Sequence, residues 1–445
     1  MGAFATTAQA YDNPRSAEWH LDALHMPEVW QTSTGQGITV AVIDGGVKAD
    51  APDLVGQVLP GKDFSGLPGG PTTDNDGHGT GMASMIAGSG KSFGGKGATG
   101  LAPGAKILPL RVNSTSSVSS SVTMSQVDQA IRYATDNGAQ VISISLAMRD
   151  VDLTSSDLAA LKTEADYAIG KGRLIVAGAG NSAQEGDPVM YPAAMPGVAA
   201  IGAFDQTGTH IAESEYGPYI ALAGPGQDIY SACTDPTGYC HSNGTSDATA
   251  LTAAAAAILW QVHPSWTGSQ ILRVMINSAD KPNDGSNHSP YIGFGNISPR
   301  NSIHYTGDPG PADVNPLIAA GIDVNPSASP ATLGSAPASA AAGAPSGAPA
   351  VGGESAPAHT ATATGKSSAG SVPLLVGGVV VALVVIGLVI FLVVRRRATP
   401  PPPAAPLGYP VYQQPPGYGT QPPPPVGGNP YQQSPPPGPY NPPQG

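Results

Sequence analysis

The amino-acid sequence predicts an α/β fold, with a mainly parallel β-sheet between layers of helices and one transmembrane helix near the C-terminus. Two observations predict the sheet. Short apolar runs rich in β-branched residues alternate with helix-like segments, and polar residues follow several of these runs where the strands would end. A third observation predicts the membrane helix, since residues 372–394 form an uncharged apolar run of 23 residues.

Five apolar runs are predicted to be strands that are buried on both faces. They are Gly37–Asp44, Ala105–Val112, Ala139–Leu146, Arg173–Gly180 and Val198–Asp205. Helices are predicted between them over His78–Ala87, Met124–Asn137 and Leu158–Lys171, and a buried helix over the alanine-rich run that begins near Ser246. This alternation implies right-handed crossovers and a parallel sheet, in which functional groups collect at the carboxyl ends of the strands.

Composition divides the 445 residues into a globular domain and four other segments. Residues 11–307 mix apolar runs, turns and scattered charge, which is typical of a domain with a large core. Residues 1–10 end in the small-x-small pattern of a signal-peptide cleavage site, so we interpret them as a signal-peptide remnant with its true start upstream. Residues 308–371 are rich in Ala, Pro, Ser and Gly and are predicted to be a flexible linker.

The run at 372–394 would cover about 35 Å as a helix, enough to cross a bilayer core once. Arg395, Arg396 and Arg397 follow it, and such a cluster marks the cytoplasmic side. We therefore expect a single-pass protein of the cell membrane, with its N-terminal domain extracytoplasmic and residues 395–445 cytoplasmic. This tail is rich in proline and tyrosine, which suits either a solvated segment or a docking site for a cytoplasmic partner.

Charge and cysteine content exclude some classes of function. The net charge is −12 and the globular part has no basic stripe, which argues against nucleic-acid binding. The two cysteines, Cys233 and Cys240, have six residues between them in a loop, and in an oxidising compartment they are predicted to form a local disulfide. A metal site would need more ligands than this pair supplies, so no metal ligands are predicted.

Four polar residues occupy predicted strand or helix ends. Asp44 closes a strand, His78 and Ser246 begin helices, and Asn181 follows another strand. Each has an ordinary structural interpretation as a turn or capping residue. Together they supply a carboxylate, an imidazole base, a nucleophile and an amide donor, which are the groups that serine-dependent acyl transfer requires.

The motifs around these residues, VAVIDGGV, DGHGT, AGAGN and NGTSDAT, resemble those of the subtilisin-type serine proteases, in the same order and over about residues 16–304. The resemblance implies a three-layer subtilisin-like fold, a triad of Asp44, His78 and Ser246, and an oxyanion hole formed by the Asn181 side chain and the Ser246 backbone N–H. The protease domain, linker, membrane helix and basic tail together resemble the mycosins, which implies a place beside the type VII secretion machinery. The family sometimes binds calcium, but no stretch identifies ligands here, and no other cofactor is expected.

The same resemblance implies two backbone edges that would hold an extended peptide substrate between them. The residues it assigns to substrate binding are Arg111, Val112, Asn113, Ser145, Leu146 and Ala147.

Two positions depart from the family pattern, because Asp247 follows Ser246 and Ala250 stands where the family has proline. Asp247 either only favours the helix dipole or lies near the cleft and affects the chemistry. These departures leave an alternative open, in which the domain is a weakly active or inactive scaffold of a secretion complex. An α/β-hydrolase esterase is disfavoured, since Ser246 does not lie in a G-x-S-x-G elbow and the order Asp44, His78, Ser246 is not the order of that family's triad.

Overall fold

The structure is a computed structural model that describes residues 13–114 and 118–323. The predicted signal-peptide remnant, membrane helix and cytoplasmic tail lie outside these residues, as does most of the predicted linker. Within the described part of the chain, no helix has the length and apolar character needed to cross a membrane.

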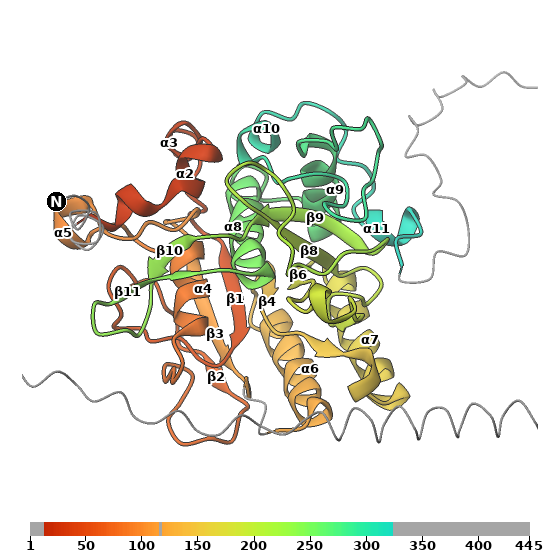
Figure 1. The fold of residues 1–445 in the computed structure, drawn as a ribbon, viewed down its shortest axis with the longest axis horizontal. Coiled ribbons are helices and arrows are strands. Elements are labelled where there is room, and N and C mark those ends of the chain that lie inside the picture. The colour runs from red at the N-terminus through yellow and green to blue at the C-terminus, as the bar shows by residue number, and fades with distance from the viewer. Residues whose placement is uncertain (1–12, 115–117, 324–445) are drawn as a thin grey trace, which may run out of the picture. The chain divides into compact units, whose positions relative to one another are not determined.

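The fold is organised around a seven-stranded sheet in which every pair of neighbouring strands is parallel (Figure 1). In spatial order its strands are β2 (Lys62–Asp63), β3 (Lys106–Arg111), β1 (Thr39–Asp44), β4 (Val141–Ile144), β6 (Leu174–Gly178), β8 (Ala199–Phe204) and β9 (Ile220–Pro225). The five predicted strands and the mainly parallel sheet are confirmed, each strand being shorter than its predicted run. Strands β2 and β9, at the two edges, were not predicted.

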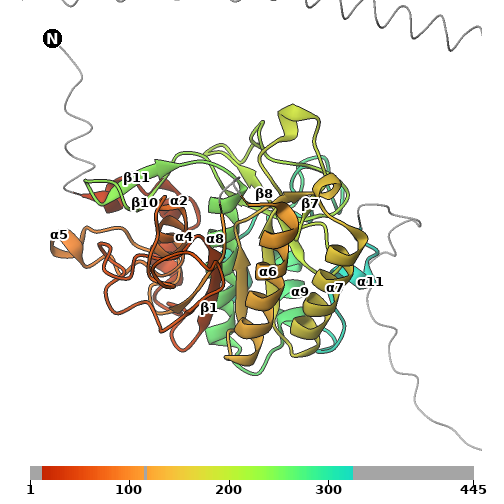
Figure 2. The ribbon, with the colours of Figure 1, turned by 90° about the horizontal axis from the view of Figure 1, so that it is seen from below.

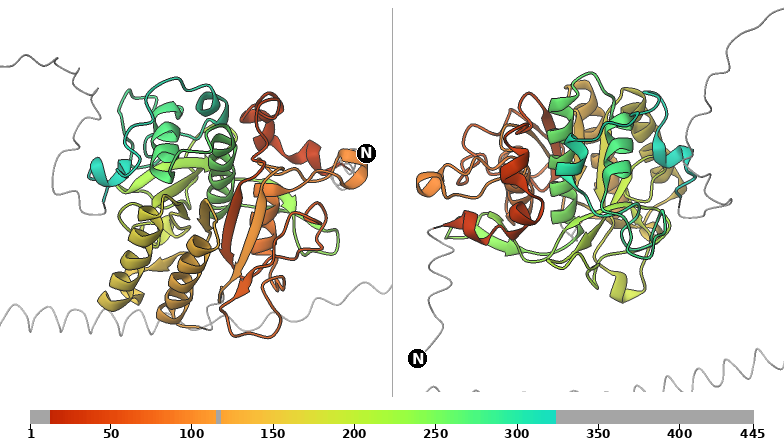
Figure 3. Two further views of the ribbon diagram at one scale, coloured as in Figure 1. Left: turned by 180° about the vertical axis from the view of Figure 1, so that it is seen from behind. Right: turned by 90° about the horizontal axis from the view of Figure 1, so that it is seen from above.

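Both faces of the sheet are buried, which explains the continuous apolar runs. In β1, Val40 and Val42 belong to one core cluster, whereas Ala41 and Ile43 belong to the other. Helices α6 (Ser120–Asp136) and α7 (Ser155–Gly170) pack on the second cluster. Helices α4 (His78–Ala87), α8 (Thr245–Val262) and α9 (Gly268–Ser278) pack on the first (Figure 2, Figure 3). The sheet therefore lies between two helix layers, as predicted.

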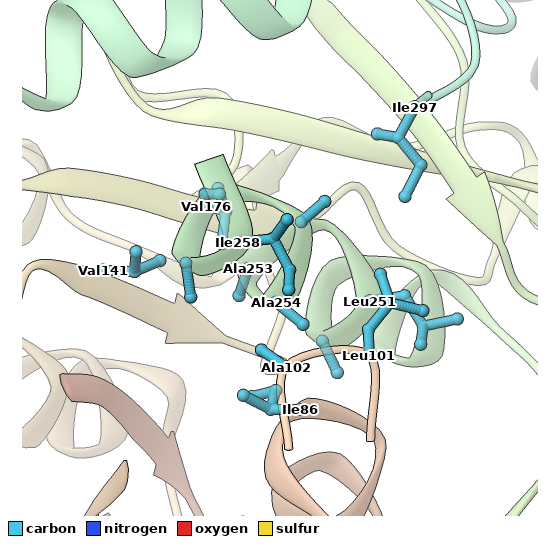
Figure 4. Packing of buried hydrophobic residues seen from close by; sticks show 14 of the residues in the cluster. Ile86, Leu101, Ala102, Val141, Val176, Leu251, Ala253, Ala254, Ile258 and Ile297 are labelled. Atoms are coloured by element: carbon cyan, nitrogen blue, oxygen red, sulfur yellow. The ribbon is translucent and has the colours of Figure 1, made fainter. Parts of the chain in front are cut away.

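Helix α8 runs through the interior with almost every side chain buried. Its alanines, including Ala253 and Ala254, let the helix approach the sheet closely, and Ile258 belongs to the same core cluster as Val141 of β4 and Val176 of β6 (Figure 4). Alanine has the highest helix propensity and a small side chain, so the run suits a helix surrounded by protein. This packing fixes the helix axis and with it the position of Ser246 at its start.

The remaining elements are short and lie around these layers. They are η1 (Pro14–Ala17), α2 (Trp19–Ala23), α3 (Met26–Val29), α5 (Ser92–Gly95), β5 (Met148–Arg149), η2 (Asp150–Asp152), η3 (Ala183–Glu185), β7 (Met190–Tyr191), β10 (Ile229–Ala232), β11 (Tyr239–Ser242), α10 (Pro299–Ile303) and α11 (Pro316–Ala319). Strands β10 and β11 form an antiparallel pair, and the structure pairs Cys233 with Cys240 beside their connecting loop.

The folded domain continues past the predicted boundary between residues 307 and 308. The guanidinium of Arg273 donates hydrogen bonds to the carbonyl oxygens of Pro309, at 2.8 Å, and Val314, at 2.7 Å. Asn315 donates to the Gly197 carbonyl at 2.9 Å, and Leu317 is buried. Residues 308–323 therefore belong to the fold, because one arginine and a short helix attach a segment whose composition alone suggested a linker.

Candidate active site

The four predicted catalytic residues come together at one rim of the sheet. Asp44 is the last residue of β1, His78 the first of α4, and Ser246 the second of α8, whereas Asn181 follows β6. The carboxyl ends of neighbouring parallel strands lie at the same edge of a sheet, and α4 and α8 both begin there. Residues that are far apart in the sequence thereby form a single site.

The Asp44 carboxylate is fully buried, and the Nδ1 atom of His78 lies 2.9 Å from each of its two oxygens. The Gly45 amide donates a hydrogen bond to the same carboxylate at 2.7 Å. This contact orients the imidazole so that Nδ1 faces the carboxylate, which leaves Nε2 as the ring nitrogen available for proton transfer.

The start of helix α4 is held by two other acidic side chains. Asp74 accepts hydrogen bonds from the Gly77 and Thr80 amides, both at 2.9 Å, and Asp76 accepts one from the His78 amide at 3.0 Å. These carboxylates accept hydrogen bonds from amide groups that a helix start leaves unpaired, and their negative charge interacts favourably with the positive end of the helix dipole. At Gly79 a Cβ atom would lie 2.1 Å from the Gly46 carbonyl, so only glycine allows α4 to approach β1 this closely.

The charge of Asp44 raises the pKa of His78 from 6.5 to about 9, and burial opposes this shift. The hydrogen bond to Asp44 and the charges of Asp247 and Asp76 raise it further. At neutral pH the imidazole is therefore mostly protonated in the unliganded protein. Since a general base must be neutral, activity should rise as the pH approaches 9.

The hydroxyl of Ser246 donates to the backbone carbonyl of Ser145 at 3.3 Å, and the Ser145 hydroxyl donates to the Ser246 carbonyl at the same distance. The nucleophile candidate is thus tied to the segment that follows β4. Ser246 and His78 line the same cavity. Rotation about the Cα–Cβ bond of Ser246 can redirect the hydroxyl towards His78. Hydrogen bonds between catalytic groups often shorten only when substrate binds.

The Asn181 side chain is oriented by helix α8. Its Oδ1 accepts a hydrogen bond from the Thr245 amide at 2.8 Å, and the Thr245 hydroxyl accepts one from the Gly180 amide at 3.1 Å. With Oδ1 occupied in this way, the Nδ2 group is the donor that Asn181 can offer to a ligand. The Ser246 amide, in the first turn of α8, is among those that a helix start leaves without an intrahelical partner.

A cavity of about 470 Å³ joins these groups. Its lining residues are Asp76, His78, Ser114, Ser145, Leu146, Ala147, Gly178, Gly180, Asn181, Ser182, Met190, Thr245 and Ser246. Three of the six residues predicted to bind substrate, Ser145, Leu146 and Ala147, are therefore at the cavity.

The other three, Arg111, Val112 and Asn113, do not line this cavity, and their side chains are buried. Arg111 forms an ion pair with Asp63 at 3.1 Å and donates to the Gly45 carbonyl at 3.2 Å, next to Asp44. The side chains of this trio are therefore structural, because the strand end from which they come is covered on both faces. The following residue, Ser114, reaches the cavity, whereas residues 115–117 lie outside the described residues.

Several cavity residues were not predicted. Asp76 is the first residue of the DGHGT motif and Ser114 directly follows Asn113, so their position offered a signal. Met190 offered none, because it precedes a Tyr-Pro turn far from the other motifs and enters the cavity from the short strand β7.

Asp247 lies one residue beyond Ser246 but does not line the cavity, and its side chain is buried. Burial raises its pKa to about 7, while a hydrogen bond with Ser242 and the charge of His78 lower it. One carboxylate oxygen, Oδ2, is buried without a hydrogen-bond partner among the described residues. Its influence on the site is therefore electrostatic, through the raised pKa of His78.

A parallel α/β sheet that carries an aspartate–histidine pair, a serine at a helix start and an adjacent amide donor has the arrangement of a serine hydrolase. The chain belongs to the subtilase family, whose Peptidase S8 model matches residues 35–295, and it is a subtilisin-like serine protease. Among curated proteins it is 34% identical to subtilisin Savinase of Lederbergia lenta over 267 residues, which are 60% of this chain and 92% of that protein. It is 33% identical to thermitase of Thermoactinomyces vulgaris over 290 residues, or 65% of this chain and 97% of that protein.

Solved structures of mycosins are also similar to this chain. The match to MycP1 from Mycobacterium smegmatis has a TM-score of 0.57 and 27% identity, and covers 66% of this chain and 86% of that chain. The match to the MycP3 protease from the type VII (ESX-3) secretion system has a TM-score of 0.55 and 30% identity, covering 64% and 88%.

We predict that Asp44→Asn returns the pKa of His78 from about 9 towards its ordinary 6.5, because the largest charge that raises it is removed. Histidine NMR titration measures this in a Ser246→Ala background, which prevents self-digestion. Turnover of the Asp44→Asn enzyme should fall by about 10⁴-fold, as in other triads, since the imidazole tautomer is no longer fixed. Asp50→Asn, at an exposed carboxylate, should leave the titration unchanged. A His78 midpoint that does not respond to Asp44→Asn contradicts the proposed pairing.

We predict that Asp247→Asn raises turnover of a peptide substrate at pH 8, where the Asp247 carboxyl is largely ionised. Removing its charge lowers the pKa of His78, and each unit of that decrease gives up to about tenfold more neutral imidazole below the pKa. The pH–rate profile should therefore shift to lower pH. An unchanged profile shows that Asp247 only supports the helix start.

Proposed function

We propose that this chain is a membrane-anchored, extracytoplasmic serine endopeptidase that uses Asp44, His78 and Ser246 as its triad. The observation that carries the proposal is the contact of His78 Nδ1 with both oxygens of the buried Asp44 carboxylate, at 2.9 Å, at the edge of a cavity that also contains Ser246. A binding module has no need of a buried carboxylate paired with an imidazole at a cavity that a serine also lines.

In the proposed reaction, the neutral His78 imidazole takes the proton of the Ser246 hydroxyl as the oxygen attacks the scissile carbonyl. Asp44 stabilises the imidazolium that forms. The Asn181 amide and the Ser246 backbone N–H donate to the oxyanion. The imidazolium then protonates the leaving amine, and water releases the acyl group from Ser246 by the same steps.

The cavity supports an extended peptide substrate. Ser145, Leu146 and Ala147 form one wall, and the backbone of such a segment can pair with a substrate strand. Ala147 and Met190 add apolar side chains to the lining, which favours an apolar substrate side chain over a charged one.

The proposed location rests on the sequence beyond the described residues, namely the apolar run at 372–394 and the three arginines after it. Similarity to MycP1 and MycP3 supports a place beside a type VII secretion system, since MycP3 is described as the protease of such a system. We therefore extend the proposal to a mycosin-like protease held at the outer face of the cell membrane.

A fluorophosphonate probe tests the catalytic proposal. Probe labelling of the purified domain, read by intact mass, should add one adduct, because the probe reacts only with a serine activated by a neighbouring base. Ser246→Ala should abolish labelling, whereas Ser242→Ala, at a nearby serine outside the cavity, should retain it. Folded wild-type protein that remains unlabelled at pH 9 favours the alternative, an inactive scaffold of a secretion complex.

Fractionation of a Gram-positive host tests the membrane anchor. With a signal peptide supplied upstream, the full chain should remain in the membrane pellet after carbonate extraction, and a chain that ends at Ser371 should be released, since it lacks the apolar run. A tag at the C-terminus should be protected from external protease in intact protoplasts. Release of both chains contradicts the predicted span.

A further inference from the structure

The loop that carries Asn181 is held by a neighbouring segment that contains Glu215. The Glu215 amide donates to the Gly180 carbonyl at 3.0 Å, and the Glu215 side-chain Oε1 accepts from the Ser182 amide at 2.9 Å. One residue thus bonds to the backbone on both sides of Asn181. A third bond, from the Ala183 amide to the Glu213 carbonyl at 3.2 Å, extends the pairing.

The Glu215 side chain also packs directly against this loop. It is fully buried, and a Cβ atom on Gly180 would lie 2.6 Å from Glu215 Cγ and 2.7 Å from Met190 Cγ. Gly180 has a φ of +117°, a conformation that favours glycine. Because glycine has no Cβ atom, Glu215 can pack directly against the backbone before Asn181. The glutamate therefore fixes the loop by shape as well as by hydrogen bonding.

Burying a carboxyl costs folding free energy unless an interaction that the carboxyl makes offsets it. Burial raises the pKa of Glu215 to about 8, with the neighbouring Asp187 carboxyl as the second cause. Its Oε2 atom has no donor among the described residues, so a hydrogen bond to Asp187 requires a proton on one of the two carboxyl groups. What Glu215 provides in return is the acceptor for Ser182.

The far side of Asn181 is fixed by helix α8, through the bond from the Thr245 amide to Asn181 Oδ1 at 2.8 Å. That bond sets the rotation of the amide group but not the position of the Asn181 backbone. The Thr245 hydroxyl holds the Gly180 amide at 3.1 Å, and the two bonds of Glu215 hold the two peptide groups that directly flank Asn181.

We propose that Glu215 is a positioning residue that places the Asn181 amide for oxyanion stabilisation by holding the peptide groups on either side of it. This inference rests on the proposed role of Asn181. Glu215 does not line the cavity, so it acts through Asn181 and not on the substrate.

A double-mutant cycle tests this role through the kcat and KM of a peptide substrate. Glu215→Met keeps most of the side-chain volume but removes the acceptor, and it should lower kcat by about 10- to 100-fold with little change in KM, the effect of a donor displaced by a fraction of an ångström. Asn181→Ala alone should lower kcat by about 100- to 1,000-fold, the magnitude established for loss of the oxyanion-hole asparagine of subtilisin, a member of the same family. In the Asn181→Ala background, Glu215→Met should change kcat by less than about twofold, because its partner is gone.

Two further variants separate positioning from general stability. Glu215→Gln retains an oxygen that can accept from Ser182 and should restore kcat to near the wild-type value. Glu185→Ala removes an exposed glutamate from the same loop, together with its 3.8 Å contact to Arg149, and should leave kcat unchanged. Where Glu215→Met does not fold, judged by its melting transition, Glu215→Asp replaces it, since the shorter side chain withdraws the acceptor.

The outcomes distinguish this inference from the proposed function. An equal loss of kcat from Glu215→Met with and without Asn181 overturns the positioning role, as does an unchanged kcat in folded Glu215→Met. In both cases the proposed function stands if Ser246 is labelled by the probe and Asn181→Ala is slow. An Asn181→Ala enzyme with wild-type kcat instead removes the oxyanion role on which the inference rests.

Discussion

The geometry of the site depends on the burial of helix α8 through the centre of the molecule. A helix surrounded by protein must present small side chains where the sheet and the other helices approach it, and the alanine run does so. Because its axis is fixed along its whole length, its first turn is fixed as well. Ser246 therefore occupies a defined place relative to His78 on α4 and to the loop after β6.

The charge of the His78 imidazole depends on the carboxylates that are buried near it, Asp44 and Asp247. Asp44 faces His78 with both oxygens and so stabilises an imidazolium, the charged species that forms during the proposed reaction. Asp247 is also buried but has one oxygen without a partner among the described residues, and its charge adds to the same effect. The departure of Asp247 from the family pattern thus acts on the base, although the residue is adjacent to the nucleophile.

Residue pattern alone sufficed for the parallel sheet, for most of its strands and for the four residues at its rim, because strand ends and helix starts carry local signals. It gave no indication that the Arg111 side chain pairs in the interior with Asp63, a partner that no local pattern reveals. It missed Glu215, because a stretch of polar residues suggests an exposed turn. The site residues of α4 and α8 were accessible to prediction, whereas the contacts between distant loops that hold them were not.

The two proposed oxyanion donors are held in different ways. The Ser246 amide belongs to a helix whose position is set by apolar packing. Asn181 belongs to a loop, where apolar packing is sparse and hydrogen bonds must supply the rigidity. A buried acceptor is strong in this role because a hydrogen bond to a carboxyl in low-dielectric surroundings is stronger than one exposed to water. We therefore relate the cost of burying the Glu215 carboxyl to the position of the proposed oxyanion donor, which is on a loop and not on a helix.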